Sequence, residues 1–348
     1  MRAPSLILLL LTLSGCASES NPFIASNSPD QRTQSTPLQS RPTLSVVLST
    51  EPWTFGTSTG SIIRTPSYRL FTTTTRPILL SRVPVFLESS LTHYRSAFVQ
   101  LPPPPIKLDT YLMQTRPEWA NLTRLLMQRR APVYLQIERG GFAAEGRGIY
   151  RDLGSLNDTL NIAAHEGWHQ YTQLAFRHRL PIALEEGIAS YMEGFRWDPN
   201  QPEKPIFLPW ANPERFDQLR LAADSQALLS LPELLSTTPQ QLIAVDQNKA
   251  LTWYAQVWTL IHFLNEGDQG AHADDLRRLL LDSATGTRNS ISRSAGQSLS
   301  QAALFTKAFH ASPSALDASY QNFIRQITRP GMRSAIIAGR SPLDSSTH

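Results

Sequence analysis

The sequence predicts an α+β protein in which an N-terminal subdomain with a mixed α/β sheet precedes a mainly helical subdomain. Segments rich in β-forming residues gather in residues 44–156, whereas long apolar stretches with helical spacing dominate residues 157–330. The chain is 41% hydrophobic with a mean hydropathy of −0.24, values typical of a globular protein. The roughly 300 residues after the N-terminal region are enough for a large core in one or two domains.

Residues 1–16 are predicted to be a lipoprotein signal peptide. Arg2 precedes an apolar run, Leu6 to Leu13, that is too short to cross a bilayer as a helix. The sequence Leu-Ser-Gly-Cys ending at Cys16 resembles a bacterial lipobox, in which the cysteine is lipidated and becomes the first residue of the mature protein. Cys16 is the only cysteine, so an intramolecular disulfide is excluded. An incidental cysteine is the alternative, but its place directly after the apolar run favours lipidation.

We therefore expect a protein anchored in the bacterial cell envelope by lipid on Cys16 rather than by a spanning helix. A residue other than Asp after the cysteine, here Ala17, is similar to outer-membrane lipoproteins, which implies the periplasmic face of that membrane. Residues 17–43 are mostly Ser, Thr, Pro, Gln and Asn, a composition that predicts a disordered tether. The net charge is only +4, and no basic run is interleaved with aromatic residues, so nucleic acid is not expected as a partner.

Residues 44–156 alternate between strand and helix signals. Strands are predicted at 67–74, 106–112 and 133–137, where β-branched and aromatic residues concentrate. Helices are predicted at 79–98, from the spacing of its apolar residues, and at 118–128. Two glycine pairs, Gly140-Gly141 and Gly146-x-Gly148, then lead into the short segment Ile149-Tyr150-Arg151.

The second half is mainly helical. A proline-rich stretch, 198–216, is expected to be loop, and residues 249–264 form a strongly apolar predicted helix. Residues 284–300 are a predicted flexible loop, helices are expected near 300–310 and 314–327, and residues 331–348 are expected to be a flexible tail.

The strongest functional signal is the sequence His165-Glu166-x-x-His169. Residues four apart share one face of a helix, so the two imidazoles can point at a single ion, and neutral imidazole suits Zn²⁺. Glu166 is displaced by about 100° around the helix. It can therefore stand beside the metal and accept a proton from water without being a ligand. The alternative is a solvated helix with two surface histidines, but this segment is apolar nearly all round, which predicts burial.

A second segment, beginning after Pro181, offers the missing carboxylate ligand. Apolar residues at helical spacing predict one core-facing stripe, with Glu186 and Glu193 on the opposite side and Glu185 between the two faces. Periodicity alone allows either Glu185 or Glu186 as the metal ligand. Glu193 is a candidate for holding a ligand histidine by its other ring nitrogen, or else an exposed acid.

Together, H-E-x-x-H and the following L-x-E-G-x-A-x-Y resemble the gluzincin metallopeptidases, and especially peptidase-MA-like bacterial proteins of unknown function. The resemblance covers the region from about Tyr68 to Leu264. It implies a zincin-like fold with the metal site between the two subdomains and one Zn²⁺ held by His165, His169 and Glu186. The sequence departs from the pattern at Ala183, where a Trp is usual, and in a slightly short spacing of sixteen residues, 170 through 185, between His169 and Glu186.

The resemblance also suggests two parts of a substrate site. The strand just before the metal helix often forms the sheet edge that pairs with an extended substrate, which points to Gly148, Ile149 and Tyr150, with a plain structural hairpin as the alternative. Tyr254 occupies a place similar to the gluzincin tyrosine that stabilises the oxyanion, with a tyrosine at the edge of the core as the alternative.

The sequence as a whole predicts a membrane-anchored zinc metallopeptidase that hydrolyses a peptide or protein substrate with Glu166 as general base. Two alternatives stay open: a non-catalytic envelope lipoprotein that uses a peptidase-like fold as a binding module, and a hydrolase of cell-wall peptides.

Overall fold

The computed structural model describes residues 46–138, 140–243, 246–287 and 300–346, and over these ranges the chain has the predicted α+β architecture. The predicted signal peptide with Cys16, the tether at 17–43 and most of the loop predicted at 284–300 lie outside the described residues. Within the described ranges, no helix combines the length and the apolar character needed to cross a membrane.

A six-stranded mixed sheet forms the first half of the described chain. Two parallel pairings, β3 with β4 and β4 with β6, lie in its middle, and the remaining neighbours are antiparallel. The strands follow the spatial order β1-β2-β3-β4-β6-β5. Their bounds are β1 Ser49–Phe55, β2 Ser58–Arg64, β3 Tyr68–Thr72, β4 Leu108–Met113, β5 Gly141–Ala144 and β6 Arg147–Arg151.

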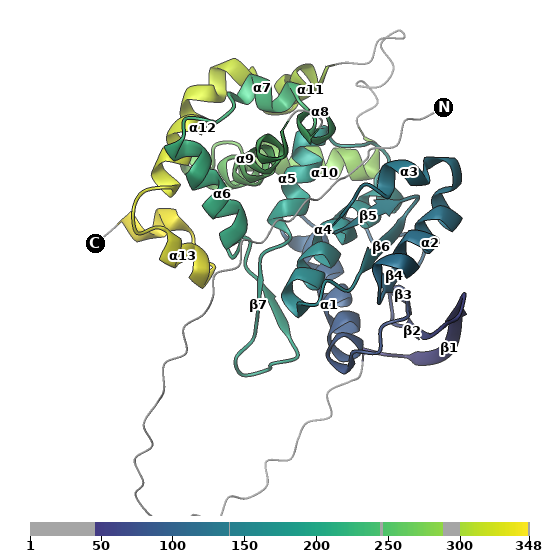
Figure 1. Ribbon diagram of the computed structural model, residues 1–348. Coiled ribbons are helices and arrows are strands. Elements are labelled where there is room, and N and C mark those ends of the chain that lie inside the picture. Colours follow the sequence, from purple (N-terminus) through teal and green to yellow (C-terminus); the bar gives the residue numbers. More distant parts are fainter. Residues whose placement is uncertain (1–45, 139, 244–245, 288–299, 347–348) are drawn as a thin grey trace, which may run out of the picture.

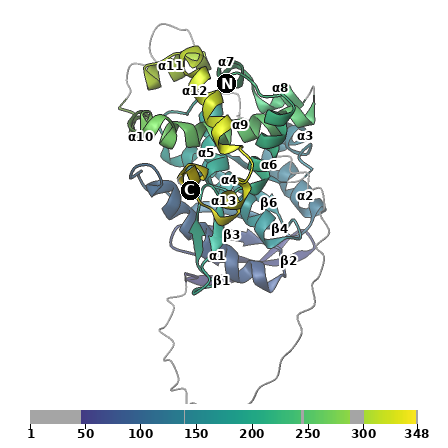
Figure 2. The ribbon, with the colours of Figure 1, turned by 90° about the vertical axis from the view of Figure 1, so that its left-hand side faces the viewer.

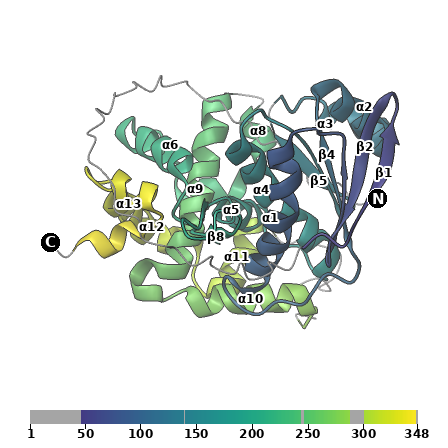
Figure 3. The same ribbon diagram turned by 90° about the horizontal axis from the view of Figure 1, so that it is seen from below.

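Helices cover both faces of this sheet (Figure 1). The long helices α1 (Pro77–Ser96) and α4 (Leu156–Ala175) pack on one face, and α2 (Arg116–Met127) packs on the other. The alternation of a strand explains the division: Leu112 of β4 joins the core under α1 and α4, whereas the next residue, Met113, joins the cluster under α2. Figure 3 shows α1 and α4 between the sheet and the helices of the second half of the chain.

The strand predicted at 133–137 is wrong, because this segment overlaps the short helix α3 (Ala131–Tyr134), which is preceded by a 3-10 turn at Gln128–Arg130. Ala131 and Tyr134 of α3, and Ile137 just after it, are buried at every third position, so they reach one cluster from a helical turn and the residues that follow it rather than from a strand of period two. Pro132 suits the first turn of a helix, where its missing N–H is not needed.

Helix α9 is the centre of the second half, and neighbouring helices surround it (Figures 1 and 2). One hydrophobic cluster runs from the sheet through α1, α4 and α5 to α9, so the two halves share a core. A two-stranded hairpin, β7 (Phe195–Trp197) and β8 (Pro205–Phe207), projects between them. The helices are α5 Ile182–Tyr191, α6 Pro213–Asp224, α7 Leu231–Ser236, α8 Pro239–Ile243, α9 Gln247–Glu266, α10 Ala273–Thr285, α11 Gln301–Phe309, α12 Pro313–Ile327 and α13 Arg333–Ala338, with 3-10 turns at Gly267–Gly270 and Pro342–Ser346.

The flexible tail expected at 331–348 is also a wrong prediction for its described part. Helix α13 packs against α6 there, with Ile336 fully buried and Arg333 bonded to Asp217 at 2.8 Å. A six-residue helix gives little sequence signal, and tertiary contacts of this kind are what stabilise it.

Candidate metal centre

Helix α4 carries the two histidines and is fixed to the sheet beside them. His165 and His169 lie one turn apart, both buried, with ring centroids 5.0 Å from each other. The next residue, Gln170, donates from Nε2 to the main-chain oxygens of Asp109 (2.8 Å) and Gly146 (3.1 Å) and accepts from the Thr110 hydroxyl (3.0 Å). These bonds tie the helix to the strands, so the histidines have a rigid support.

Gly167, inside the motif, allows a second helix to approach α4 closely. A Cβ at this position would lie 2.6 Å from the hydroxyl oxygen of Tyr94 on α1. That hydroxyl donates to the main-chain oxygen of Ala164 at 2.7 Å. The glycine costs about 1 kcal/mol of helix propensity, and the close contact with α1 is the structural reason for it.

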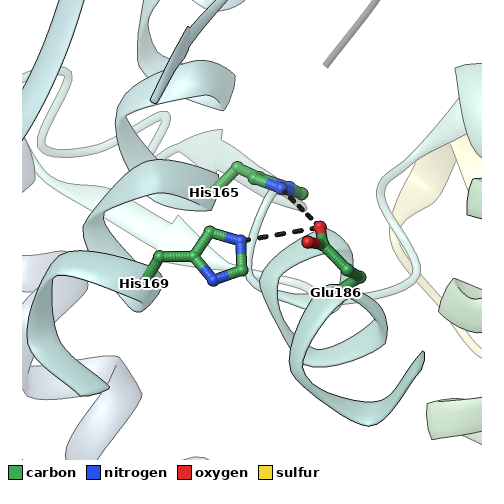
Figure 4. Close-up of side chains that lie close together, drawn as sticks. All are labelled: His165, His169 and Glu186. Carbon is green, nitrogen blue, oxygen red and sulfur yellow. Dashed lines mark ion pairs between the residues drawn. The ribbon is translucent and has the colours of Figure 1, made fainter. Parts of the chain in front are cut away.

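Helix α5 brings Glu186 to the histidines (Figure 4). Its Oε2 atom lies 3.4 Å from His165 Nε2 and 3.6 Å from His169 Nε2, and the three ligand atoms lie within 4.8 Å of one another. Gly187 fixes the position of α5, because a Cβ there would lie 2.5 Å from the main-chain oxygen of Val257 on α9. Glu186 is therefore a candidate ligand whose neighbour, Gly187, makes the close contact that positions its helix.

A further carboxylate contacts the Nδ1 atom of each imidazole. His165 Nδ1 lies 2.8 Å from Glu193 Oε1, and Glu193 is buried, so of the two alternatives for Glu193 the structure has the one that holds a histidine rather than the exposed acid. His169 Nδ1 lies 3.1 Å from Glu185 Oε1, which also accepts from the Thr172 hydroxyl at 2.7 Å. The choice that periodicity left open is thus resolved in the geometry: Glu186 faces both Nε2 atoms, and Glu185 orients one ring. Such carboxylate–imidazole contacts fix the tautomer and direct Nε2 toward a metal.

Two residues of the site were missed by the sequence analysis, which expected 198–216 to be loop. Arg215 donates from Nη2 to Glu193 Oε1 at 2.9 Å, and Asn212 donates from Nδ2 to Glu193 Oε2 at 2.7 Å. Asn212 is also the N-cap of α6. An Asn-Pro pair is a signal for a helix start, but no spacing rule connects it with the histidines.

Burial and charge act in opposition on the acids and bases of this site. Burial raises the pKa of Glu186, but the positive charge of His169 and the contact with His165 outweigh it and lower the pKa to about 2. Burial likewise raises the pKa of Glu193, and Arg215 together with His165 lowers it to about 2. Burial lowers the pKa of His169, but Glu186 and Glu185 raise it to about 10.

Five buried polar atoms at the centre have no hydrogen-bond partner among the described residues: Nε2 of His165 and His169, Oε2 of Glu186, and both carboxylate oxygens of Glu166. Unsatisfied buried polar atoms are costly, and natural proteins rarely leave several together. Two imidazole nitrogens and a carboxylate oxygen that converge on one point fit a divalent metal ion. The three side chains His165, His169 and Glu186 could therefore hold a metal ion.

The other two predicted site residues lie next to this cluster. Burial raises the pKa of Glu166 to about 7, although the charges of the two histidines and the main-chain N–H of Ala143 favour its ionised form. Tyr254 on α9 is buried, with its ring centroid 6.4 Å from that of His165 and the Arg215 guanidinium 5.2 Å from its centroid. Burial raises the pKa of Tyr254 well above its ordinary value, so its phenol is protonated at neutral pH.

The strand predicted for the substrate is misplaced. Gly148, Ile149 and Tyr150 belong to β6, which pairs on one side with β4 and on the other with β5, so it has no open edge. The preceding residues Glu145 and Gly146 both have positive φ (53° and 73°), the conformation of a tight hairpin turn. This turn places β5 outside β6, and β5 is the edge strand of the sheet.

No protein-family model matches this chain, and no curated protein matches it. The residues and their geometry therefore carry the functional argument.

The first prediction concerns the pH dependence of metal uptake. In the metal-free protein the raised pKa of His169, about 10, keeps its ring protonated at neutral pH. A metal ligand must be deprotonated, and the pKa of His165 is raised as well, so zinc binding between pH 6 and 8 is expected to release at least one proton per site and to become at least tenfold tighter per pH unit. Calorimetric titration in buffers of different ionisation enthalpy measures both quantities.

The matched variant is Glu186→Gln, which removes both a ligand charge and the group that raises the pKa of His169. We expect it to bind zinc much more weakly than the wild type at pH 7, whereas Glu203→Gln, an exposed control, leaves zinc binding unchanged. Tight zinc binding by Glu186→Gln, or zinc uptake without proton release, would contradict the assignment.

Proposed function

We propose that this protein is a zinc-dependent metallopeptidase with a zincin-like fold. The observation that carries the proposal is the buried cluster of His165, His169 and Glu186, with the unpartnered carboxylate of Glu166 on the same helix. Two imidazoles and one carboxylate are the ligand set of many hydrolytic zinc sites, which keep a further position open. The L-x-E-G-x-A segment supports the same reading, because its Glu186 is the residue that faces both histidines.

When bound, zinc would supply a Lewis acid that lowers the pKa of water and polarises a carbonyl oxygen. The chain's own residues then move the proton. Glu166 accepts it from the attacking water on a carboxylate oxygen and passes it to the nitrogen of the leaving amine. A pKa of about 7 suits both steps, because the group can take and return a proton near neutral pH.

Tyr254 is the proposed hydrogen-bond donor to the substrate oxygen on which negative charge develops. It comes from α9, opposite α4, and lies against the His165 ring. A protonated phenol is a neutral donor whose hydrogen bond strengthens as that charge grows. Arg215 lies over its ring and adds positive potential at this end of the site.

Strand β5 replaces β6 as the proposed partner of an extended substrate. It is an edge strand, and its residue Ala143 lies next to α4, because Gln173 donates to the main-chain oxygen of Ala143 at 3.0 Å. Glu166 lies near the same residue, whose main-chain N–H affects its pKa. A peptide added along β5 would therefore run close to the general base.

The natural setting proposed from the sequence is the cell envelope, with the enzyme attached by lipid at Cys16. The substrate is then a peptide or protein in the same compartment. The alternatives, a non-catalytic binding module and a hydrolase of cell-wall peptides, differ in what the purified protein cleaves.

Hydrolysis assays separate these functions. The mature protein, loaded with zinc, is incubated with a peptide library and with purified murein, each with and without a chelator. Peptide cleavage that the chelator abolishes and zinc restores is the expected result. Cleavage of murein peptides alone would favour the cell-wall substrate, and zinc binding without any cleavage would favour the binding module.

A further inference from the structure

A pocket opens beside the metal cluster at the junction of α4 and α5, with a cavity volume of about 170 Å³. His169, Glu185 and Glu186 form one end of its wall. The other end is the connecting segment Phe176–Pro181, which follows α4 directly and includes the sequence Arg177-His178-Arg179. The metal centre and a basic segment therefore share one cavity.

The wall of this pocket divides into an apolar part and a charged part. Phe176, Leu180 and Ile182 supply apolar surface, while Arg177 and Arg179 are exposed at the opening. The two acidic residues of the wall are engaged at the metal centre, Glu186 facing both histidines and Glu185 at His169 Nδ1. With a divalent ion offsetting those two acids, Arg177 leaves the pocket with a positive charge.

The main chain and the stem of Arg177 are held in place by α10. The main-chain N–H groups of Arg177 and His178 both donate to the Ser283 oxygen at 3.0 Å. The Arg177 stem lies against Gly286, where a Cβ would be 2.6 Å from its Cδ. The guanidinium is thus carried at the pocket on an anchored segment, and it has no carboxylate partner within the described part of the chain.

We propose that this pocket binds a carboxylate of the substrate, with Arg177 as the principal specificity-determining residue. The inference rests on the proposed peptidase function and adds the substrate class. The six residue steps from His169 to Ala175 rise about 9 Å along the helix. Up to about three extended substrate residues span that distance. The carboxylate is therefore on an acidic side chain near the scissile bond, or it is the C-terminus of a short peptide.

Paired peptides test this substrate class. Each pair shares one sequence and differs only in Glu against Gln at one position within three residues of the cleaved bond, or in a free acid against an amide at the C-terminus. A charge-assisted arginine–carboxylate bond favours the acidic member by about tenfold or more in kcat/KM. Whichever pair shows the preference identifies the source of the carboxylate.

Variants then assign the preference to Arg177. Arg177→Gln is expected to lower kcat/KM for the acidic peptide to that of its neutral partner, so that the preference is lost, and Arg177→Glu is expected to favour a Lys-containing peptide. Arg220→Gln, an exposed arginine on α6, is the matched control and keeps the wild-type preference. An equal rate for both members of every pair in the wild type, or a preference that survives in Arg177→Gln, would overturn the proposal.

A binding measurement makes the pocket testable independently of turnover. Fluorescence anisotropy of the labelled acidic and neutral peptides is recorded with Glu166→Gln protein, in the presence and absence of zinc. The same measurement is made with the double variant that combines Glu166→Gln and Arg177→Gln. If the wild type hydrolyses no peptide but the acidic peptide binds to Glu166→Gln protein in an Arg177-dependent way, the proposed function fails and the carboxylate site stands. If peptides are hydrolysed and both members bind equally, the proposed function stands and the carboxylate site is refuted.

Discussion

Replacement of Glu166 by Gln is expected to reduce kcat for peptide hydrolysis by about 10² to 10⁴, the usual contribution of a general acid–base group. The amide keeps the size of the side chain but cannot accept the proton from water. Zinc content should be unchanged, because Glu166 is not among the three residues whose ligand atoms converge. Steady-state kinetics and elemental analysis on the same preparation measure the two quantities.

Glu166→Gln is also expected to keep or raise the stability of the metal-free protein, whereas replacement of an acid with a purely structural role would lower it. The pKa of Glu166 in the folded protein, about 7, is raised above the ordinary value of 4.5. This acid therefore lowers the stability of the metal-free protein as the pH rises from 4.5 to 7, where only the unfolded state ionises freely. Glu166→Gln should be at least as stable as the wild type at pH 8. Urea unfolding of the metal-free proteins, with Glu203→Gln as control, measures this.

Either of two outcomes would remove Glu166 from the proposed role. One is a variant that hydrolyses peptides at the wild-type rate. The other is a variant that loses zinc together with activity, which would mean that the side chain supports the metal rather than the proton transfer.

Replacement of Glu193 by Ala is expected to destabilise the protein by about 3–5 kcal/mol, because it leaves a buried charge without its partner. Arg215, 2% exposed, bonds to this carboxylate, and so do Asn212 and His165. His165 also loses the group that orients its ring, so zinc affinity should fall by about 10- to 100-fold. Chemical denaturation and zinc titration measure the two effects, with Glu203→Ala as exposed control.

A double variant separates the two effects of Glu193. Glu193→Leu combined with Arg215→Met removes both charges, so most of the stability should return, whereas the loss of zinc affinity should persist because His165 still lacks its partner. The pH dependence has a definite sign: the pKa of Glu193 is lowered to about 2, so its stabilisation is present above pH 4.5 and is lost as the pH falls toward 2. Equal stability of wild type and Glu193→Ala at pH 7 would contradict the network.

Elements with strong local signals were predicted well, and those without were not. The long helices α1 and α9 follow from apolar spacing, because a helix with a continuous buried face leaves a periodic pattern in the chain. Strand 133–137 failed because a short apolar run has no length over which to distinguish the helical period from that of a strand. The position of β6 inside the sheet depends on a two-residue turn whose first residue is Glu145, an unusual residue for positive φ.

The sequence by itself determined the candidate metal-binding motif: His165, Glu166 and His169 lie on one helix, and a single turn of that helix places both imidazoles on one face. It also limited the third ligand to two adjacent glutamates. Only the tertiary structure decided between them and assigned Glu185 and Glu193 to separate histidines. It also brought Arg215 and Asn212 to Glu193 from a segment more than forty residues after His169. The physical reason is that helical periodicity fixes the direction of a side chain relative to its own helix, whereas the angle between helices is set by close contacts such as that of Gly187 with Val257.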